Sequence, residues 1–441
     1  MLYNIEDYVY DSGLQVLYGQ RSNIPKCETI NNEYLSEISF LKKQKSTSFS
    51  RKTVQKAGIV LTANCNLRCN YCSQCSEEGQ EEKISMSSIK VFIDDILKKS
   101  IIASIIDDSE AVLSVTFTGG GEPTYRWTLL KESVMYLVGA CEKNHVKLEL
   151  QINTNGVFSR EQADFIVKHF KKIMISYDGH PFMQNKNRQF SNQQRSSEIV
   201  EENIRYLSSL NPAVMIRTTI WQEDFDYLQK AADYIISNFP NVYSWDINPV
   251  TPAGRAVDVF KSRGRAIDKD FLGVYISLCE HIKSRKQNLQ IFSSLFSHHH
   301  IGFSCGAVTP YTRRLWLMPD GSIITCADSS EIRTEVGHIN DSTLVYYESY
   351  EDRLLDQGIK QSKACKDCIA LGVCGGGCPI KHIREEQDRT GMVAWECEMQ
   401  RQYWTYVLKE LIKKREFDNV YLCSIGDETL EMYQIKWREV K

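Results

Sequence analysis

The chain has 441 residues, 42% of them hydrophobic and 25% charged, a length that suits one large catalytic domain with one or two smaller units. Its net charge of -3 gives no reason to expect nucleic acid or an acidic membrane as partner, and neither a membrane span nor a secretory signal is visible. We therefore predict a cytoplasmic protein whose 15 cysteines serve metal or redox chemistry rather than disulfides.

Strand-like and helix-like segments alternate through the first half of the chain. The predicted strands cover 59–61, 112–117, 147–152, 173–176, 214–220 and 243–248. The predicted helices between them cover 87–105, 127–143, 159–170, 197–207 and 225–238, and Ser159 begins a capping box. This alternation predicts an α/β fold with parallel strands, in which functional loops follow the strands.

The flanking segments lack this rhythm. Residues 1–55 are interpreted as an N-terminal extension, 261–304 as a helical connector, and 401–441 as a C-terminal helix followed by a tail. The triplet His298, His299 and His300 lies in the connector. Consecutive histidines point in different directions, so a solvated loop is favoured over a metal site.

Cys65, Cys69 and Cys72 follow the first predicted strand within eight residues. Three thiolates hold three irons of a cubane cluster and leave the fourth iron open to another ligand. Cys75 is a candidate fourth thiolate, and a zinc site remains an alternative from spacing alone.

The form Cys-x-x-x-Cys-x-aromatic-Cys after a first strand resembles the signature of radical S-adenosylmethionine (SAM) enzymes. That resemblance implies that SAM chelates the open iron, that Tyr71 lies near the adenine, and that Cys75 is a bystander. It also implies a partial (β/α)6 TIM-like barrel over residues 56–260.

Residues at later strand ends strengthen this resemblance. The run of Gly120, Gly121 and Glu122 resembles the Gly-Gly-Glu motif that holds the SAM amino group. By the same resemblance Ser176 would bond the ribose and Arg217 the SAM carboxylate, with Asn155 at the third strand end as a further cofactor-binding candidate. Taken singly, Asn155 is also a good turn residue and Arg217 an ordinary strand charge.

A second cysteine array occupies residues 305–400 and resembles the small iron-sulfur SPASM domain of peptide-modifying radical SAM enzymes. The resemblance implies two auxiliary 4Fe-4S clusters, three clusters in all. The first would use Cys305, Cys326 and Cys378, and the second Cys365, Cys368, Cys374 and Cys397. A zinc ribbon is the alternative, because Cys-x-x-Cys is also a zinc half-site.

Two features differ from the anaerobic sulfatase maturases of this family. Residues 306–325 contain no additional cysteine, which leaves the first auxiliary cluster with three thiolates. Ala327 separates Cys326 from Asp328, where those maturases have the aspartate directly after the cysteine. Asp328 is thus a candidate catalytic base, with a solvated turn acid as the alternative.

The resemblance predicts an oxidoreductase that generates a 5'-deoxyadenosyl radical and removes hydrogen from a ribosomally made precursor peptide, forming a thioether, carbon-carbon or ether crosslink. Epimerisation, sulfatase maturation, quinone-cofactor biosynthesis and a non-catalytic iron-sulfur or zinc scaffold are alternatives. Expected partners are the peptide and an electron donor such as flavodoxin or ferredoxin. Residues 1–55 look too short for a leader-binding domain, so a separate leader-recognition protein is one option.

Overall fold

The computed structural model describes most of the first two thirds of the chain and shorter stretches beyond. The described residues are 2–5, 8–11, 16–19, 54–79, 84–106, 108–263, 270–285, 289–293, 295–296, 314–326, 335–340, 342–347, 368–370, 374, 394–414, 419–425 and 429–434. The chain divides into two compact units. The larger comprises Thr53–Leu295 and Gly306–Gln357, and the smaller Met1–Lys52, Phe296–Cys305 and Gly358–Lys441.

The larger unit is built on an 11-stranded sheet in the part of the chain that the structure describes. Seven parallel strands follow one another in chain order across it: β4 (Val54–Ile59), β5 (Val112–Phe117), β6 (Lys147–Thr154), β7 (Lys172–Ser176), β8 (Val214–Ile220), β9 (Ser244–Pro249) and β10 (Gln290–Phe292). Beyond β4 the sheet continues with β11 (Arg314–Leu317), β12 (Ser322–Ile324), β13 (Glu335–Asn340) and β14 (Thr343–Tyr346). The described edge strands do not pair with each other, so the barrel is open, as predicted.

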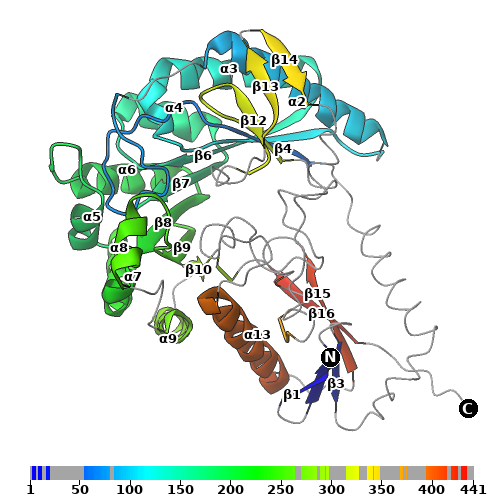
Figure 1. The fold of residues 1–441 in the computed structure, drawn as a ribbon, viewed down its shortest axis with the longest axis vertical. Helices are drawn as coiled ribbons and strands as arrows, with labels where there is room; N and C mark the ends of the chain where they lie inside the picture. The colour runs from blue at the N-terminus through cyan, green and yellow to red at the C-terminus, as the bar shows by residue number, and fades with distance from the viewer. Residues whose placement is uncertain are drawn as a thin grey trace, which may run out of the picture. The chain divides into compact units, whose positions relative to one another are not determined.

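Helices connect the parallel strands and cover the outside of the sheet (Figure 1). The connecting helices are α2 (Met86–Ile106), α3 (Trp127–Lys143), α4 (Arg160–His169), α5 (Pro181–Asn187), α6 (Ser197–Leu210) and α7 (Leu228–Asn238), with 3-10 turns η2 (Pro123–Arg126) and η3 (Gln222–Tyr227). After β9 come η4 (Gly254–Ala256), α8 (Val257–Arg263) and α9 (Phe271–Ser284). The predicted capping box is confirmed: Ser159 accepts a hydrogen bond from the backbone of Gln162, whose side chain accepts one in return.

Side chains along the central strands alternate between two environments. On β7 and β8, Ile173, Ile175 and Ile216 are fully buried, whereas Ser176 and Arg217, which follow Ile175 and Ile216, are partly exposed. The apolar set forms the core, because successive residues of a strand point to opposite faces. The opposite face of these strands carries the partly exposed side chains of Ser176 and Arg217.

The smaller unit contains a five-stranded sheet that joins the two ends of the chain. Its order is β1 (Leu2–Ile5), β2 (Tyr8–Asp11), β3 (Val16–Gly19), β15 (Asn419–Ile425) and β16 (Thr429–Gln434). Strand β3 pairs antiparallel with β15, with Tyr18 opposite Asn419. Helix α13 (Ala394–Lys414) includes the start of 401–441, where the sequence predicted a C-terminal helix. The domain boundaries at residues 55, 260, 304 and 400, which were inferred from the sequence, stay a prediction.

Among the described residues, no helix combines the length and apolar character needed to cross a membrane.

Candidate functional site

The cysteine loop follows β4 directly, at the carboxyl edge of the parallel sheet. Cys65, Cys69 and Cys72 are all partly buried in this loop. Cys75 is exposed and has a positive φ of 51°, so its backbone turns the chain away after the third cysteine. The loop therefore presents three thiols from one short segment.

The glycine-rich turn after β5 holds the start of the cysteine loop. The Gly121 N–H donates to the Thr62 carbonyl at 2.8 Å, and the Glu122 N–H donates to the Asn64 carbonyl, also at 2.8 Å. A Cβ atom on Gly121 would lie 1.8 Å from the Asn64 carbonyl oxygen. Only glycine permits this approach, which fixes the backbone immediately before Cys65.

The Glu122 carboxylate is buried and connects the ends of β5 and β6. Its Oε1 accepts hydrogen bonds from the Thr124 N–H (3.1 Å), the Thr124 hydroxyl (2.8 Å) and the Thr154 hydroxyl (2.7 Å). Its Oε2 accepts from the Asn155 N–H at 2.6 Å. Burial raises the pKa of Glu122, and these hydrogen bonds partly offset that increase. Because its oxygens already bind four protein donors, Glu122 positions the turn.

Replacing Glu122 with alanine should lower the free energy of unfolding of the larger unit by about 2–6 kcal/mol. The change leaves the buried N–H groups of Thr124 and Asn155 without their acceptor, at about 1–3 kcal/mol each. Glu132, which is exposed on α3, is the matched control, and its alanine variant should differ by no more than about 0.5 kcal/mol. Denaturant unfolding of the metal-free proteins measures both changes; equal stabilities would contradict the role given to Glu122.

The turn after β9 holds the other end of the cysteine loop. The Arg255 N–H donates to the Cys72 carbonyl at 3.0 Å, and its guanidinium donates to the Cys69 carbonyl at 3.1 Å and the Ser76 carbonyl at 2.7 Å. Gly254 has a φ of +52°, and a Cβ there would lie 2.2 Å from the Cys72 carbonyl oxygen. Turns from two distant strands thus fix the loop at both ends.

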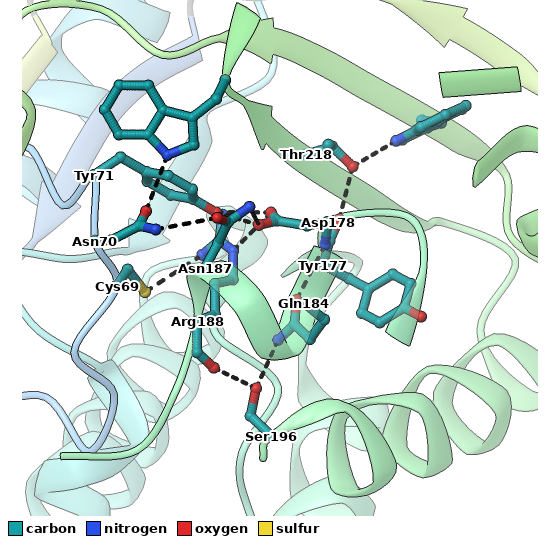
Figure 2. A network of polar contacts seen from close by, with 12 residues as sticks. Cys69, Asn70, Tyr71, Tyr177, Asp178, Gln184, Asn187, Arg188, Ser196 and Thr218 are labelled. Carbon is teal, nitrogen blue, oxygen red and sulfur yellow. Dashed lines mark hydrogen bonds and ion pairs between the residues drawn. The ribbon is translucent and has the colours of Figure 1, made fainter. Parts of the chain in front are cut away.

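A buried polar network lies beside the middle of the loop (Figure 2). The Tyr71 hydroxyl donates to the Asp178 carboxylate, with oxygen-oxygen distances of 2.6 and 2.8 Å. Arg188 Nε donates to the same carboxylate at 2.9 Å, and Asn187 Nδ2 donates at 3.1 Å. Tyr71 also packs edge-on against Trp221, whose indole N–H donates to Asn70 at 3.1 Å.

Two of the three cysteine sulfurs accept hydrogen bonds from N–H groups. Cys65 Sγ accepts from the Leu67 backbone at 3.4 Å and from Asn155 Nδ2 at 3.7 Å, and Cys69 Sγ accepts from Arg188 Nη1 at 4.0 Å. Burial raises the pKa of Cys65 to about 12 and that of Cys69 to about 11. Both thiols are protonated at neutral pH in the metal-free protein, so binding of iron must displace their protons.

This loop fits an iron-sulfur cluster. It combines three thiols, N–H donors directed at sulfur and a backbone fixed at both ends, which are the means by which a protein holds and tunes such a cluster. Among the described residues, no three His, Cys, Asp or Glu side chains are arranged to hold a single metal ion. The thiolates of a four-iron cluster are farther apart than the ligands of a single metal ion. The observation therefore argues against a single-ion site in that part of the chain and does not bear on a cluster.

Two predicted SAM-contacting residues lie on neighbouring strands, Ser176 at the carboxyl end of β7 and Arg217 in the middle of β8. Ser176 at the end of β7 is in register with Arg217 on β8, which in turn is in register with Asp246 on β9. Arg217 Nε and Asp246 Oδ2 form an ion pair at 3.0 Å. The other predicted residues belong to the loops of the same edge: Tyr71, Gly120, Gly121, Glu122 and Asn155. The contacts of all these residues with SAM stay a prediction.

Part of the second cysteine array falls within the described residues. Cys326 follows β12, Cys397 lies in α13, and Cys368 and Cys374 lie in short described stretches between them. A hydrogen bond with Cys368 raises the pKa of Arg401, one turn after Cys397. Several predicted residues lie outside the described residues: Cys305, Cys365, Cys378, Asp328 and the histidine triplet 298–300.

Arg188 and Asn187 were not identified from the sequence as parts of this site, and Asp178 was interpreted only as a turn or cap. The one local signal was the sequence Asp178-Gly179 after a strand. Gly254-Arg255-Ala256 after the sixth predicted strand also resembles the radical SAM family and was expected to shape the mouth of the barrel, but the contacts of Arg255 with the cysteine loop were not predicted. The ion pair of Arg188 and Asp178 is buried next to the cysteine loop, which is more than a hundred residues away in the sequence. Motif spacing gives no information about contacts between such distant segments.

Comparison with known proteins gives consistent matches. The family model for the radical SAM superfamily matches residues 59–235. A cysteine-type anaerobic sulfatase-maturating enzyme of Clostridium novyi (strain NT) is 22% identical over 340 residues, which cover 72% of this chain and 85% of that enzyme.

Solved structures share the fold. The native enzyme anSMEcpe with bound AdoMet and the Cp18Cys peptide aligns with a TM-score of 0.62 at 16% identity, covering 82% of this chain and 98% of that one. Streptococcus suis SuiB bound to precursor peptide SuiA aligns with a TM-score of 0.53 at 15% identity, covering 86% and 83%.

Proposed function

Because this chain is a radical SAM superfamily enzyme, we propose that it crosslinks a ribosomally made precursor peptide. The cysteine loop carries the proposal: Cys65, Cys69 and Cys72 would hold a 4Fe-4S cluster whose fourth iron binds SAM. When bound, these groups supply a 5'-deoxyadenosyl radical that takes a hydrogen atom from the substrate.

The chain's own residues would orient SAM at the carboxyl edge of the sheet. Backbone groups of Gly120 and Gly121 border the cysteine loop, while Ser176 and Arg217 stand side by side on β7 and β8. Arg217 is already paired with Asp246, so its guanidinium is held in one orientation before a carboxylate arrives. Such preorganisation reduces the cost of ordering the ligand.

A peptide substrate is supported by two observations. The C-terminal array of seven cysteines resembles the SPASM arrangement of peptide-modifying enzymes, and SuiB, whose structure was solved with a precursor peptide, shares the fold. The proposed auxiliary clusters would use Cys305, Cys326 and Cys378 for the first, and Cys365, Cys368, Cys374 and Cys397 for the second. Asp328 is the proposed base, with an external reductant such as flavodoxin or ferredoxin and an optional leader-recognition protein as partners.

Sulfatase maturation is the second candidate function, favoured by the likeness to the Clostridium novyi enzyme. Anaerobic reconstitution with iron and sulfide, followed by SAM and a reductant, should yield 5'-deoxyadenosine. A peptide encoded beside this chain should then lose two hydrogen atoms per crosslink. Modification of a cysteine-containing sulfatase peptide instead would support the maturase, and no SAM cleavage would contradict both functions.

Replacing Cys305 or Cys378 with alanine should preserve SAM cleavage and abolish crosslinked product. A substrate radical that closes a bond must give up one electron, and the first auxiliary cluster is the proposed acceptor. Mass spectrometry of the peptide and chromatography of 5'-deoxyadenosine, from the same reaction, measure the two effects separately. Normal amounts of crosslinked peptide from either variant would refute this role of the cluster.

A further inference from the structure

Arg188 is a buried cation next to the cysteine loop, and the proposed function gives it no role. It directly follows α5, where its N–H donates to the Gln184 carbonyl at 2.8 Å and its carbonyl accepts from the Ser196 hydroxyl at 2.5 Å. The residue is 7% exposed, and its partner Asp178 is 2% exposed. Burying an ion pair carries a large desolvation cost, so stability alone is a weak explanation for this one.

Three contacts fix where the guanidinium points (Figure 2). Nε is held by Asp178 at 2.9 Å, the guanidinium carbon lies 5.2 Å from the centre of the Tyr71 ring, and Nη1 donates to Cys69 Sγ at 4.0 Å. Asp178 is itself held by Tyr71 and Asn187. The planar guanidinium is thus preorganised with one edge on a carboxylate and another on a sulfur.

The two charges of the pair do not act equally on Cys69. Arg188 contacts the sulfur, whereas the Asp178 carboxylate contacts Arg188 and Tyr71. Of the two charged groups, only the guanidinium is hydrogen-bonded to the sulfur. Because electrostatic interaction strengthens as distance falls, we expect the positive charge to have the larger effect at this sulfur.

Hydrogen bonds to the sulfurs and nearby charge set the reduction potential of an iron-sulfur cluster. Reduction adds one negative charge, so a cation hydrogen-bonded to a ligand sulfur stabilises the reduced form. We propose that Arg188, which Asp178 holds in place, raises the reduction potential of the cluster held by Cys65, Cys69 and Cys72. This inference rests on the proposed function of that loop.

The test is a redox titration of the full-length, reconstituted protein. The reduced signal of this cluster is identified in electron paramagnetic resonance spectra as the one that changes when SAM is added. In the Arg188→Gln variant, the ratio of reduced to oxidised cluster at a fixed applied potential should fall about tenfold, a shift of about 59 mV for one electron.

Two further variants separate charge from structural damage. Arg188→Lys keeps the positive charge without the forked donor and should shift the potential less than Arg188→Gln. Asp178→Asn keeps an acceptor for Arg188 while removing the opposing negative charge, so its potential should shift upward. Damage to the fold has no reason to move the potential in opposite directions in Arg188→Gln and Asp178→Asn.

The outcomes are distinguishable from those of the proposed function. If the unaltered protein forms no cluster that responds to SAM, the proposed function fails. If it does, an unchanged potential in Arg188→Gln overturns the inference. Loss of the cluster in all three variants would also overturn it, since the pair would then serve assembly instead. Iron content of each variant, measured beside the titration, decides between these cases.

Discussion

Replacing Cys69 with serine is expected to remove SAM cleavage completely and to lower bound iron by the content of one 4Fe-4S cluster, about four atoms per chain. Serine keeps the size of the side chain and loses the thiolate that binds iron. Cys69 is partly buried, its sulfur accepts from the Arg188 side chain and its carbonyl accepts from Arg255, so the loop is held with this thiol in place.

Cys75 supplies the matched control for this experiment. It lies six residues further along the same segment, is exposed, and occupies a left-handed backbone conformation. Cys75→Ser should retain iron content and 5'-deoxyadenosine formation equal to those of the unaltered protein. If Cys75→Ser loses the cluster, or if Cys69→Ser retains SAM cleavage, the assignment of the open iron to the trio is wrong.

The strands of the sheet were largely predictable because their signals are local. Residues 112–117 and 214–220 are predicted and observed with identical bounds, since each segment is rich in β-branched and other apolar residues. The first strand was placed at 59–61 and is observed at Val54–Ile59. Val60 and Leu61 are fully buried although they follow the strand, and the Val60 N–H still donates to the Leu317 carbonyl of β11 at 2.9 Å. The apolar run therefore predicted a buried segment correctly but not the bounds of the strand.

Pairing between distant segments was not predictable. Strands β11 to β14 extend the sheet past β4, and β10 lies in a segment interpreted as a helical connector. In the smaller unit, β3 pairs with β15 across nearly the whole sequence. Period and turn residues identify strands but carry no information on which neighbour each one selects.

The residues of the site likewise fall into those that a local motif predicts and those whose contacts only the structure shows. The cysteine trio and the glycine-rich turn are contiguous motifs and were identified, with the radical SAM family confirmed for residues 59–235. Arg188 and Arg255 contact the loop from segments more than a hundred residues away, and these contacts were not predicted, although Arg255 belongs to a run that was matched to the family from the sequence. Sequence motifs thus predicted which groups would bind the cofactor, while the contacts that Arg188 and Arg255 make with the loop required the structure.

Replacing Gly121 with alanine should reduce SAM cleavage about 100-fold or more, since a displacement of about 1 Å in a positioned site costs on that order. The added Cβ would lie 1.8 Å from the Asn64 carbonyl oxygen, next to Cys65, and the nearest atoms are all backbone. Because backbone cannot rotate away as a side chain can, the turn and the loop must separate. Overpacking of this kind should also lower the free energy of unfolding by about 1–3 kcal/mol.

Gly139→Ala is the control that distinguishes this local clash from a general effect of adding a methyl group. Gly139 lies in the interior of α3, and a Cβ there meets no atom within 4 Å. Alanine should therefore stabilise the helix by about 0.5–1 kcal/mol and leave SAM cleavage unchanged. When the two variants are measured together, Gly121→Ala should be less stable and Gly139→Ala more stable than the unaltered protein. Only Gly121→Ala should lose SAM cleavage. Equal cleavage rates in the two variants would mean that contact between the glycine turn and the cysteine loop does not position the reacting groups.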